Sequence, residues 1–260
     1  KYYPGGKSME QGFFYMGSRD STSVSYFFSG RVSAKGKYRN GGRDGVWQYF
    51  TEDGVLARET NYRKGNEHGK DLVYMNGQLH IEYDMVNDYI EGDVIYYGEN
   101  NAVACVLKYE NRDLVGYTYP GKDGKLLPVV PIKNGTATVT SYYPNGKKSA
   151  GFNFEQGRLA GKQVAYYTNG QIAEERSLEN LDYNGPYKRY YEDGKLLYEA
   201  YYKDDQLTGA EVHYNKDGDV VKSYNYENDD LHGVQVVQDA QAPKTTTIYY
   251  YHGRPVSAVK

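Results

Sequence analysis

Residues 185–202 read GPYKRYYEDGKLLYEAYY, and this stretch decides the fold because its pattern returns along most of the 260-residue chain. The inner glycine of each copy follows the previous one after 22 to 24 residues, with one double gap of 47 that has Asn101 near its middle. Asparagine is the usual substitute for glycine where φ is positive. The spacing predicts about ten units with a period of about 24 residues. The inner glycines are Gly6, Gly30, Gly54, Gly77, Gly124, Gly146, Gly170, Gly194 and Gly218.

Each unit has the pattern of a β-hairpin. Asn-Gly or Asp-Gly occupies most of the turns, and this dipeptide predicts a two-residue type I′ turn with positive φ at both central residues. An aromatic residue commonly stands four positions before the glycine, and apolar residues stand two and eight positions after it. Offsets of +2 and +8 share parity, so these residues point to one face of a strand. A second glycine closes most units, and no segment shows a helical period.

Isolated hairpins are marginally stable in water, so the units must stack against one another. We expect an all-β protein in which residues 1–233 form one elongated antiparallel sheet of about ten stacked β-hairpins. Three prolines between residues 116 and 135 predict an irregular repeat there, with an edge, bulge or bend. The pattern fades after residue 233, and we expect residues 234–260 to form a divergent C-terminal capping segment.

The composition indicates how such a sheet is stabilised and which functions are excluded. The chain has 32 Tyr and a formal net charge of -3, so tyrosine must supply much of the apolar surface. Without a basic tract, we expect no nucleic-acid partner. No stretch approaches the roughly 18 apolar residues of a transmembrane helix, and a single cysteine forbids an internal disulfide framework.

The pattern G-x-x-x-x-Y-Y-x-x-G-x-L-x-x-E-x-x-Y resembles the MORN repeat in its bacterial variant form, as found in the YwqK-type antitoxin family. The resemblance covers residues 1–233. It implies an interaction scaffold or a membrane-proximal module, and the family's label implies an antitoxin. The variant's glutamate, five residues after the turn, is matched by Glu59, Glu82, Glu175 and Glu199, while His68-Gly69 and His232-Gly233 are similar to the His-Gly pair of the eukaryotic repeat.

We expect no catalytic residue, metal site or cofactor. The histidines lack cysteine or carboxylate partners at metal-binding spacing, and His68 and His232 are about seven units apart. Cys105, within an apolar run, is interpreted as a small strand hydrophobe. The repeated glutamates are expected to pair with neighbouring lysines or arginines on the sheet rather than to act as catalytic carboxylates.

One aromatic column is a candidate binding site. These residues stand three positions before the turn glycine and are predicted to point away from the aromatic at offset -4. They cover the second face of the sheet, or they form a ridge that binds a protein or a glycan, since aromatic rings are favoured interface anchors. The candidates are Tyr3, Phe27, Tyr143, Tyr167 and Tyr191.

We therefore expect a non-enzymatic repeat scaffold that binds an unidentified protein. The first alternative is a carbohydrate- or cell-wall-binding module, because the units also resemble choline- and glucan-binding hairpins, although those depend on tryptophan and this chain has only Trp47. The second alternative is an antitoxin. The chain begins at Lys1 without a methionine, from which we expect export to the periplasm or cell surface after signal removal, with a cytoplasmic location as the alternative. The resemblance implies a bacterial source.

Overall fold

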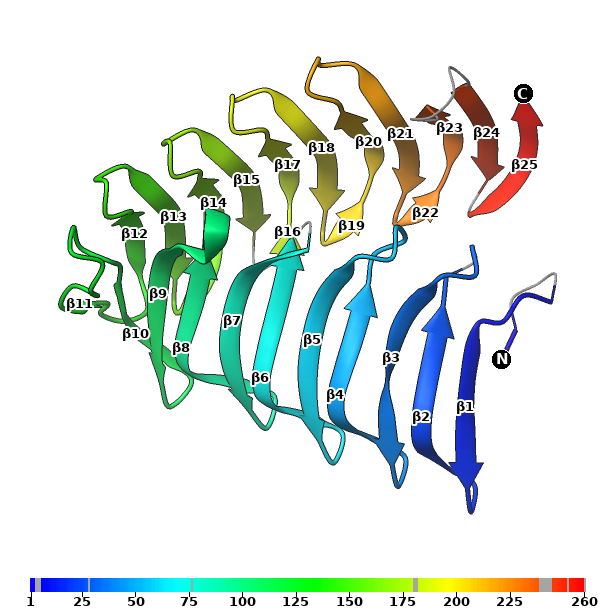
Figure 1. The fold of residues 1–260 in the computed structure, drawn as a ribbon, viewed down its shortest axis with the longest axis horizontal. Helices are drawn as coiled ribbons and strands as arrows, with labels where there is room; N and C mark the ends of the chain where they lie inside the picture. The colour runs from blue at the N-terminus through cyan, green and yellow to red at the C-terminus, as the bar shows by residue number, and fades with distance from the viewer. Residues whose placement is uncertain are drawn as a thin grey trace. The chain divides into compact units, whose positions relative to one another are not determined.

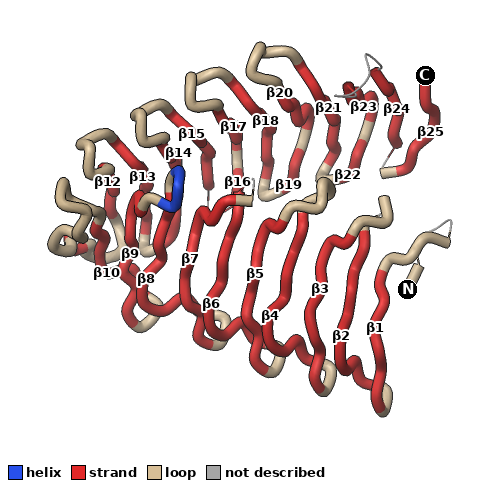
Figure 2. The backbone as a smooth tube through the Cα atoms, viewed as in Figure 1, coloured by secondary structure: helices blue, strands red, loops and turns tan. Residues whose placement is uncertain are grey.

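The computed structural model describes residues 1–2, 6–27, 29–75, 77–179, 182–238, 245–251 and 253–259. These residues form antiparallel strands with a single 3₁₀ turn at Glu99–Asn101, and no α-helix occurs among them. It follows that this part of the chain has no helix that is long and apolar enough to cross a membrane. The predicted all-β class, built from stacked hairpins, is confirmed (Figures 1 and 2).

The first half of the chain forms an 11-stranded sheet, which we call the N-terminal sheet. Every strand pairs with the next one along the chain, so each contact is local (Figure 1). Its strands are β1 (Glu10–Tyr15), β2 (Ser18–Tyr26), β3 (Val32–Arg39), β4 (Gly42–Phe50), β5 (Leu56–Arg63), β6 (Asn66–Met75), β7 (Gln78–Val86), β8 (Tyr89–Tyr97), β9 (Val103–Glu110), β10 (Asp113–Thr118) and β11 (Val130–Pro131).

The second half forms a 14-stranded C-terminal sheet with the same sequential order. Three two-residue strands, β16, β19 and β22, pair only with the strand before them. The strands are β12 (Ala137–Tyr142), β13 (Lys148–Glu155), β14 (Arg158–Tyr166), β15 (Ile172–Glu179), β16 (Asp182–Tyr183), β17 (Gly185–Tyr190), β18 (Leu196–Lys203), β19 (Gln206–Leu207), β20 (Gly209–Tyr214), β21 (Val220–Glu227), β22 (Asp230–Leu231), β23 (Gly233–Gln238), β24 (Thr245–Tyr251) and β25 (Arg254–Val259).

The expectation of one continuous sheet is wrong, because the strand ladder breaks within residues 116–135. Strand β11 pairs with β10 at only two positions, Gly116 with Pro131 and Tyr117 with Val130. Proline lacks the N–H that a ladder requires, so the three prolines here prevent a full strand. Two compact units result: Lys1–Pro120 with Leu126–Pro131, and Gly121–Lys125 with Ile132–Lys260.

The turns at the repeating glycines differ from the predicted type I′ geometry. At residues 167–171 the Gly170 N–H donates to the Tyr167 carbonyl at 2.8 Å, and the Tyr167 N–H donates to the Gln171 carbonyl at 2.8 Å. Gly170 has φ +87°, whereas Asn169 is not in the positive-φ region. Asn169 Oδ1 instead accepts the Gln171 N–H at 2.8 Å. The turn is therefore type I followed by a left-handed glycine.

Type I′ geometry occurs at the opposite ends of the strands, in the turns that join one repeat to the next. Both central residues have positive φ at Asn87-Asp88, Asp204-Asp205 and Asn228-Asp229, among others. The sequence signal was assigned to the wrong end of the hairpin, because most of these turns lack the expected Asn-Gly or Asp-Gly dipeptide, Asn40-Gly41 between β3 and β4 being an exception.

The second glycine of the repeat lies in a β-bulge at Gly45, Gly69, Gly92 and Gly161. At residues 45–47, three residues stand opposite the single residue Gly36, and Gly45 takes φ +72°. Two residues after this glycine is a side chain that we call the post-bulge residue. Trp47 is one example, and its indole N–H donates to the Lys37 carbonyl at 3.0 Å. Gln163 is another, and its amide donates to the Ala160 carbonyl at 2.7 Å. These two post-bulge residues thus donate to backbone carbonyl groups beside the bulge.

The strand registers define two faces in each sheet. One, the aromatic face, carries Tyr38, Trp47, Tyr62, Tyr83 and Tyr96 in the N-terminal sheet and Tyr183, Tyr187, Tyr198, Tyr202, Tyr224 and Tyr226 in the C-terminal sheet. The other, the polar face, carries the repeated glutamates Glu59, Glu82, Glu175 and Glu199.

Candidate functional site

Three of the five predicted binding aromatics connect consecutive repeats. The hydroxyl groups of Tyr143, Tyr167 and Tyr191 each donate to a backbone carbonyl 23 residues later, at 2.8, 2.6 and 2.8 Å. The acceptors are the carbonyl groups of Tyr166, Tyr190 and Tyr214. The sequence signal for this inter-repeat bond is the constant spacing of the three tyrosines, which occur once in each of three consecutive repeats.

The same column is only partly accessible. Tyr143 is 3% exposed, while Tyr167 and Tyr191 are half-buried. Phe27 is half-buried at the β2–β3 turn of the N-terminal sheet and has no hydroxyl to donate. Tyr3 lies outside the described residues. The role of this column in binding a partner stays a prediction, and what the structure shows is its part in joining repeats.

Three of the four repeated glutamates form the expected pair with lysine, whereas Glu59 accepts a hydrogen bond from the Gln48 amide. Lys162 Nζ lies 2.5 Å from Glu175, Lys188 Nζ lies 3.8 Å from Glu199, and Lys70 pairs with Glu82. The Lys70 hydrogen bond holds the pKa of Glu82 below its usual value. These contacts lie on the polar face and are structural.

Each of these glutamates also accepts a tyrosine hydroxyl from the next repeat, a contact that sequence reasoning missed. Tyr190 donates to Glu175 at 2.7 Å and Tyr214 donates to Glu199 at 2.6 Å. The bond to Glu199, together with burial, raises the pKa of Tyr214 to about 12. A fixed spacing of 15 residues between glutamate and tyrosine was the available signal.

On the aromatic face of the N-terminal sheet, Trp47 is the central buried side chain, at 3% exposure. Its ring lies directly on Gly36, where an added Cβ would be 2.3 Å from a ring carbon. Tyr38 and Tyr62 meet the indole edge-on, with centroid distances of 5.0 and 6.4 Å. The Arg43 guanidinium packs over the Trp47 ring at 4.8 Å. The absence of a side chain at Gly36 therefore creates the seat for the indole.

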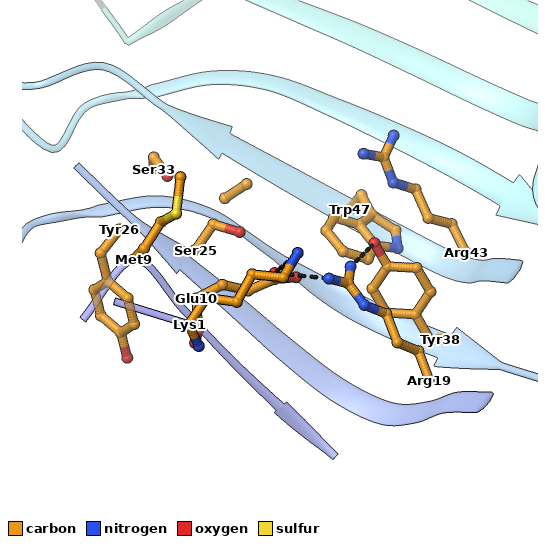
Figure 3. A pocket seen from close by; sticks show the side chains of 11 residues that line it. Lys1, Met9, Glu10, Arg19, Ser25, Tyr26, Ser33, Tyr38, Arg43 and Trp47 are labelled. Carbon is orange, nitrogen blue, oxygen red and sulfur yellow. Dashed lines mark hydrogen bonds and ion pairs between the residues drawn. The ribbon is translucent and has the colours of Figure 1, made fainter. Parts of the chain in front are cut away.

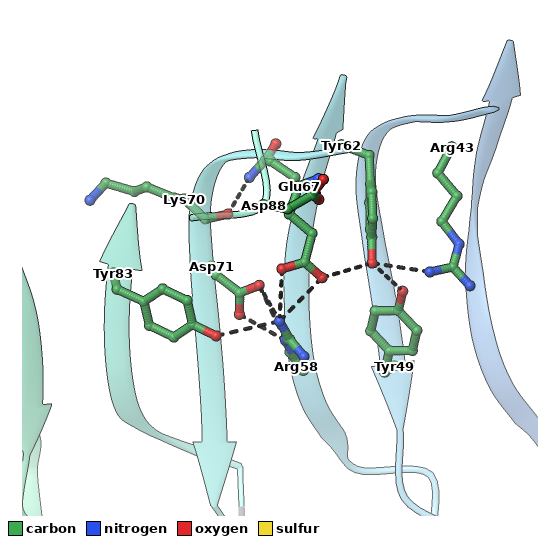
Figure 4. Close-up of polar contacts among 10 residues, drawn as sticks. Arg43, Tyr49, Arg58, Tyr62, Glu67, Lys70, Asp71, Tyr83 and Asp88 are labelled. Carbon is green, nitrogen blue, oxygen red and sulfur yellow. Dashed lines mark hydrogen bonds and ion pairs between the residues drawn. The ribbon is translucent and has the colours of Figure 1, made fainter. Parts of the chain in front are cut away.

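A network of charges around the buried Asp71 occupies the next strands of the same face (Figure 4). Asp71 is 0% exposed and accepts hydrogen bonds from Arg58 Nε at 2.9 Å and Nη2 at 2.7 Å. Glu67 lies 3.4 Å from the same guanidinium, and Tyr62 donates to Glu67 at 3.1 Å. The hydrogen bond to Asp71 raises the pKa of Arg58. Breaking this network would leave a buried carboxylate unpaired, so it stabilises the sheet only as a complete unit.

A pocket of about 370 Å³ lies on the aromatic face near β1 to β4 (Figure 3). Inside it, Arg19 donates to Glu10 at 2.7 Å and to the Tyr38 hydroxyl at 2.9 Å. Cationic side chains outnumber carboxylates, since Glu10 is the one carboxylate among the lining residues. These residues are Lys1, Met9, Glu10, Arg19, Ser25, Tyr26, Ser33, Ala34, Tyr38, Arg43 and Trp47.

The C-terminal sheet carries a continuous run of aromatic rings on its aromatic face. Neighbouring ring centroids are 4.9 to 6.5 Å apart, mostly in edge-to-face or tilted arrangements. The Glu211 carboxylate lies 2.6 Å from His213 Nε2 within the run. In order, the rings are Tyr183, Tyr202, Tyr187, Tyr198, His213, Tyr224 and Tyr226.

The remaining chemical candidates give no reactive centre. Cys105 is 0% exposed within β9, as expected of a small strand hydrophobe. His252 lies outside the described residues. In the ranges that are described, no group of three histidine, cysteine or acidic side chains could hold a metal ion.

Comparison with known proteins identifies repeats at three places. The model of a family described as "MORN repeat variant" matches residues 43–64, 159–180 and 183–204. The predicted MORN resemblance is confirmed for these segments, which include β4–β5, β14–β15 and β17–β18. No curated protein matches the chain.

Proposed function

We propose that the chain is a non-enzymatic repeat scaffold that binds another protein through the aromatic face of its sheets. MORN repeats are generally taken as interaction modules for proteins or membranes, which supports this class of function. The observation that carries the proposal is the run of seven rings from Tyr183 to Tyr226 on the C-terminal sheet.

Two physical features favour a protein as the ligand. The rings hold one another in place, so they would lose little side-chain entropy when a partner docks on them. Tyrosine is also enriched among the residues that contribute most binding energy in protein interfaces. Because the rings meet mainly edge-on, they present tilted surfaces rather than the flat ring faces on which sugars stack.

The test uses two adjacent tyrosines that point to opposite faces of β18. Tyr202 belongs to the aromatic face, and Tyr201, 49% exposed, belongs to the polar face. In affinity capture from an extract of the source cells, a partner retained by the wild type and by Tyr201→Ala should be lost with Tyr202→Ala. Thermal unfolding of both variants controls for folding. Equal retention by both folded variants would show that the aromatic face is not the docking surface.

The two rival functions have separate tests. Saturable binding on a glycan or choline array, abolished by Tyr202→Ala, would favour a carbohydrate-binding module. Co-expression that relieves the toxicity of a neighbouring gene product would favour an antitoxin.

A further inference from the structure

We propose that the pocket beside Trp47 binds a glutamate side chain of an acidic peptide, with Arg43 as the residue that anchors the carboxylate. This inference rests on the proposed function, because the peptide would be a segment of the protein partner.

The argument begins with three arginines on the aromatic face of the N-terminal sheet. Arg19 is paired with the carboxylate of Glu10 at 2.7 Å, and Arg58 is paired with that of Asp71 at 2.7 Å. Arg43, on the strand between them, makes no ion pair with a carboxylate of the described chain. Its hydrogen-bond partner is a neutral group, the Tyr62 hydroxyl, at 3.0 Å (Figure 4). Two of the three arginines therefore bind a carboxylate of the sheet, and Arg43 does not.

Arg43 is already held in place. Its guanidinium packs over Trp47 at 4.8 Å and over Tyr62 at 5.1 Å, and Tyr62 is itself hydrogen-bonded to Glu67 and Tyr49. A planar guanidinium fixed between rings can present two parallel N–H groups to a carboxylate. Because the side chain is ordered before the ligand arrives, little conformational entropy is lost on binding.

The charge of the pocket favours an anion. Lys1, Arg19 and Arg43 line it against the single carboxylate of Glu10, which Arg19 and Lys1 both contact. An incoming carboxylate at Arg43 therefore meets a site with excess positive charge. The partly buried position of Arg43 reduces screening by solvent and strengthens the attraction.

The apolar part of the lining distinguishes a glutamate side chain from a bare anion. Met9 and the Trp47 ring line the same space as Arg43 (Figure 3). Ala34 also belongs to the lining. These groups would contact the methylene stem of a glutamate while its carboxylate reaches Arg43. A volume of about 370 Å³ is at the small end of ligand pockets, which suits one or two side chains of a peptide.

Trp47 is the single tryptophan of the chain and lines the pocket, so its fluorescence reports on occupancy. The probe is a pentaglutamate peptide blocked at both ends, and the comparison ligands are blocked pentaglutamine and inorganic phosphate. We expect a saturable fluorescence change with pentaglutamate, no change with pentaglutamine, and weaker binding of phosphate. Isothermal calorimetry on the same samples detects binding that leaves the fluorescence unchanged.

The variant Arg43→Gln should weaken pentaglutamate binding by at least about tenfold, because a charge-assisted contact is lost. Arg39→Gln is the matched control, since Arg39 is 74% exposed, alternates with Tyr38 on β3 and pairs with Asp44. It should bind as the wild type does. If Arg43→Gln fails to fold, Arg43→Lys keeps the charge but loses the paired N–H geometry, and it should bind several-fold more weakly.

Each contrary result is decisive. Equal weakening by Arg39→Gln and Arg43→Gln, or no binding by either method, would overturn the proposal. Phosphate binding as tight as pentaglutamate binding would overturn the assignment to glutamate. Partner capture is tested separately, through Tyr202 on the other sheet. If the pocket does not bind pentaglutamate while the wild type still captures its partner, this inference is refuted and the proposed function is not.

Discussion

The hydroxyl of Tyr167 donates a 2.6 Å hydrogen bond to the backbone carbonyl of Tyr190, the equivalent strand end one repeat later. Tyr143 and Tyr191 make the same bond to the repeats that follow them. Consecutive hairpins are therefore joined by side-chain bonds at their turns as well as by the strand ladder. These bonds supply part of the cohesion of the C-terminal sheet.

Replacing Tyr167 by Phe removes the hydroxyl and leaves the ring. We expect the free energy of unfolding to fall by about 1 to 2 kcal/mol, because the Tyr190 carbonyl loses its partner. Denaturant-induced unfolding measures the change. Tyr201→Phe is the control, since Tyr201 is 49% exposed, and its effect should stay within about 0.5 kcal/mol. Equal effects would mean that the inter-repeat bond contributes nothing to stability.

Acid should weaken the polar-face ladder through Glu82. The Lys70 hydrogen bond lowers the pKa of this carboxyl below 4.5 in the folded state. Its contribution is therefore present above about pH 4.5 and is lost as the pH falls through the folded pKa. Urea unfolding of the wild type and of Glu82→Gln between pH 7 and pH 3 should give a difference in stability that shrinks toward pH 3. A difference that stays constant with pH would contradict this.

Alkali should weaken the glutamate–tyrosine bonds at Tyr214. Its hydrogen bond to Glu199 and its burial raise the pKa of the phenol from 10.0 to about 12. A raised pKa gives stability that is present below pH 10 and is lost as the pH rises through about 12. The difference in ultraviolet absorbance titration between the wild type and Tyr214→Phe isolates this phenol. In a Glu199→Gln background the same difference should move to lower pH, and no movement would exclude Glu199 as a cause.

Gly36→Ala should disturb the seat of Trp47. The new Cβ would lie 2.3 Å from the indole, so the ring must move, and we expect a loss of about 1 to 3 kcal/mol with a red-shifted tryptophan emission. Gly151→Ala is a matched change in another strand, where the nearest atom to the new Cβ would be 4.0 Å away. It should be neutral or slightly stabilising. Unchanged emission in Gly36→Ala would show that the indole does not rest on this glycine.

The sequence predicts the hairpins well because each one is encoded locally. Glycine spacing and aromatic columns locate most strands. The regular column of Tyr143, Tyr167 and Tyr191 identifies residues that recur in consecutive repeats, but it does not show that their hydroxyl groups bond to the next repeat. The turn type was wrong because Asn169 uses its side chain to accept a backbone N–H, which favours ordinary φ over positive φ. Local patterns describe the backbone better than they describe side-chain partners.

The candidate pocket could not be predicted, because the repeat pattern places Tyr26, Tyr38 and Trp47 at recurring positions but does not show which side chains meet beside them. Trp47 and Asp71 are both post-bulge residues, yet one fills space over Gly36 and the other accepts hydrogen bonds from Arg58. Arg43 differs from Arg19 and Arg58 in pairing with no carboxylate of the described chain, and the sequence does not show which side chains lie near it in space. The division into two sheets likewise depends on how residues around Pro131 pair, which the count of prolines alone does not determine.

The variety of the post-bulge residues also bears on which strands pair with one another while the chain folds. Near-identical hairpins in tandem invite mispairing, in which a strand skips a copy or joins another molecule. The backbone bonds and the turn tyrosines would be satisfied almost equally well in such a slipped array. Trp47 and Asp71 would not be, since each fits only the strand that carries Gly36 or Arg58. These irregular side chains thus distinguish their copies of the repeat from the others, which the shared pattern does not do.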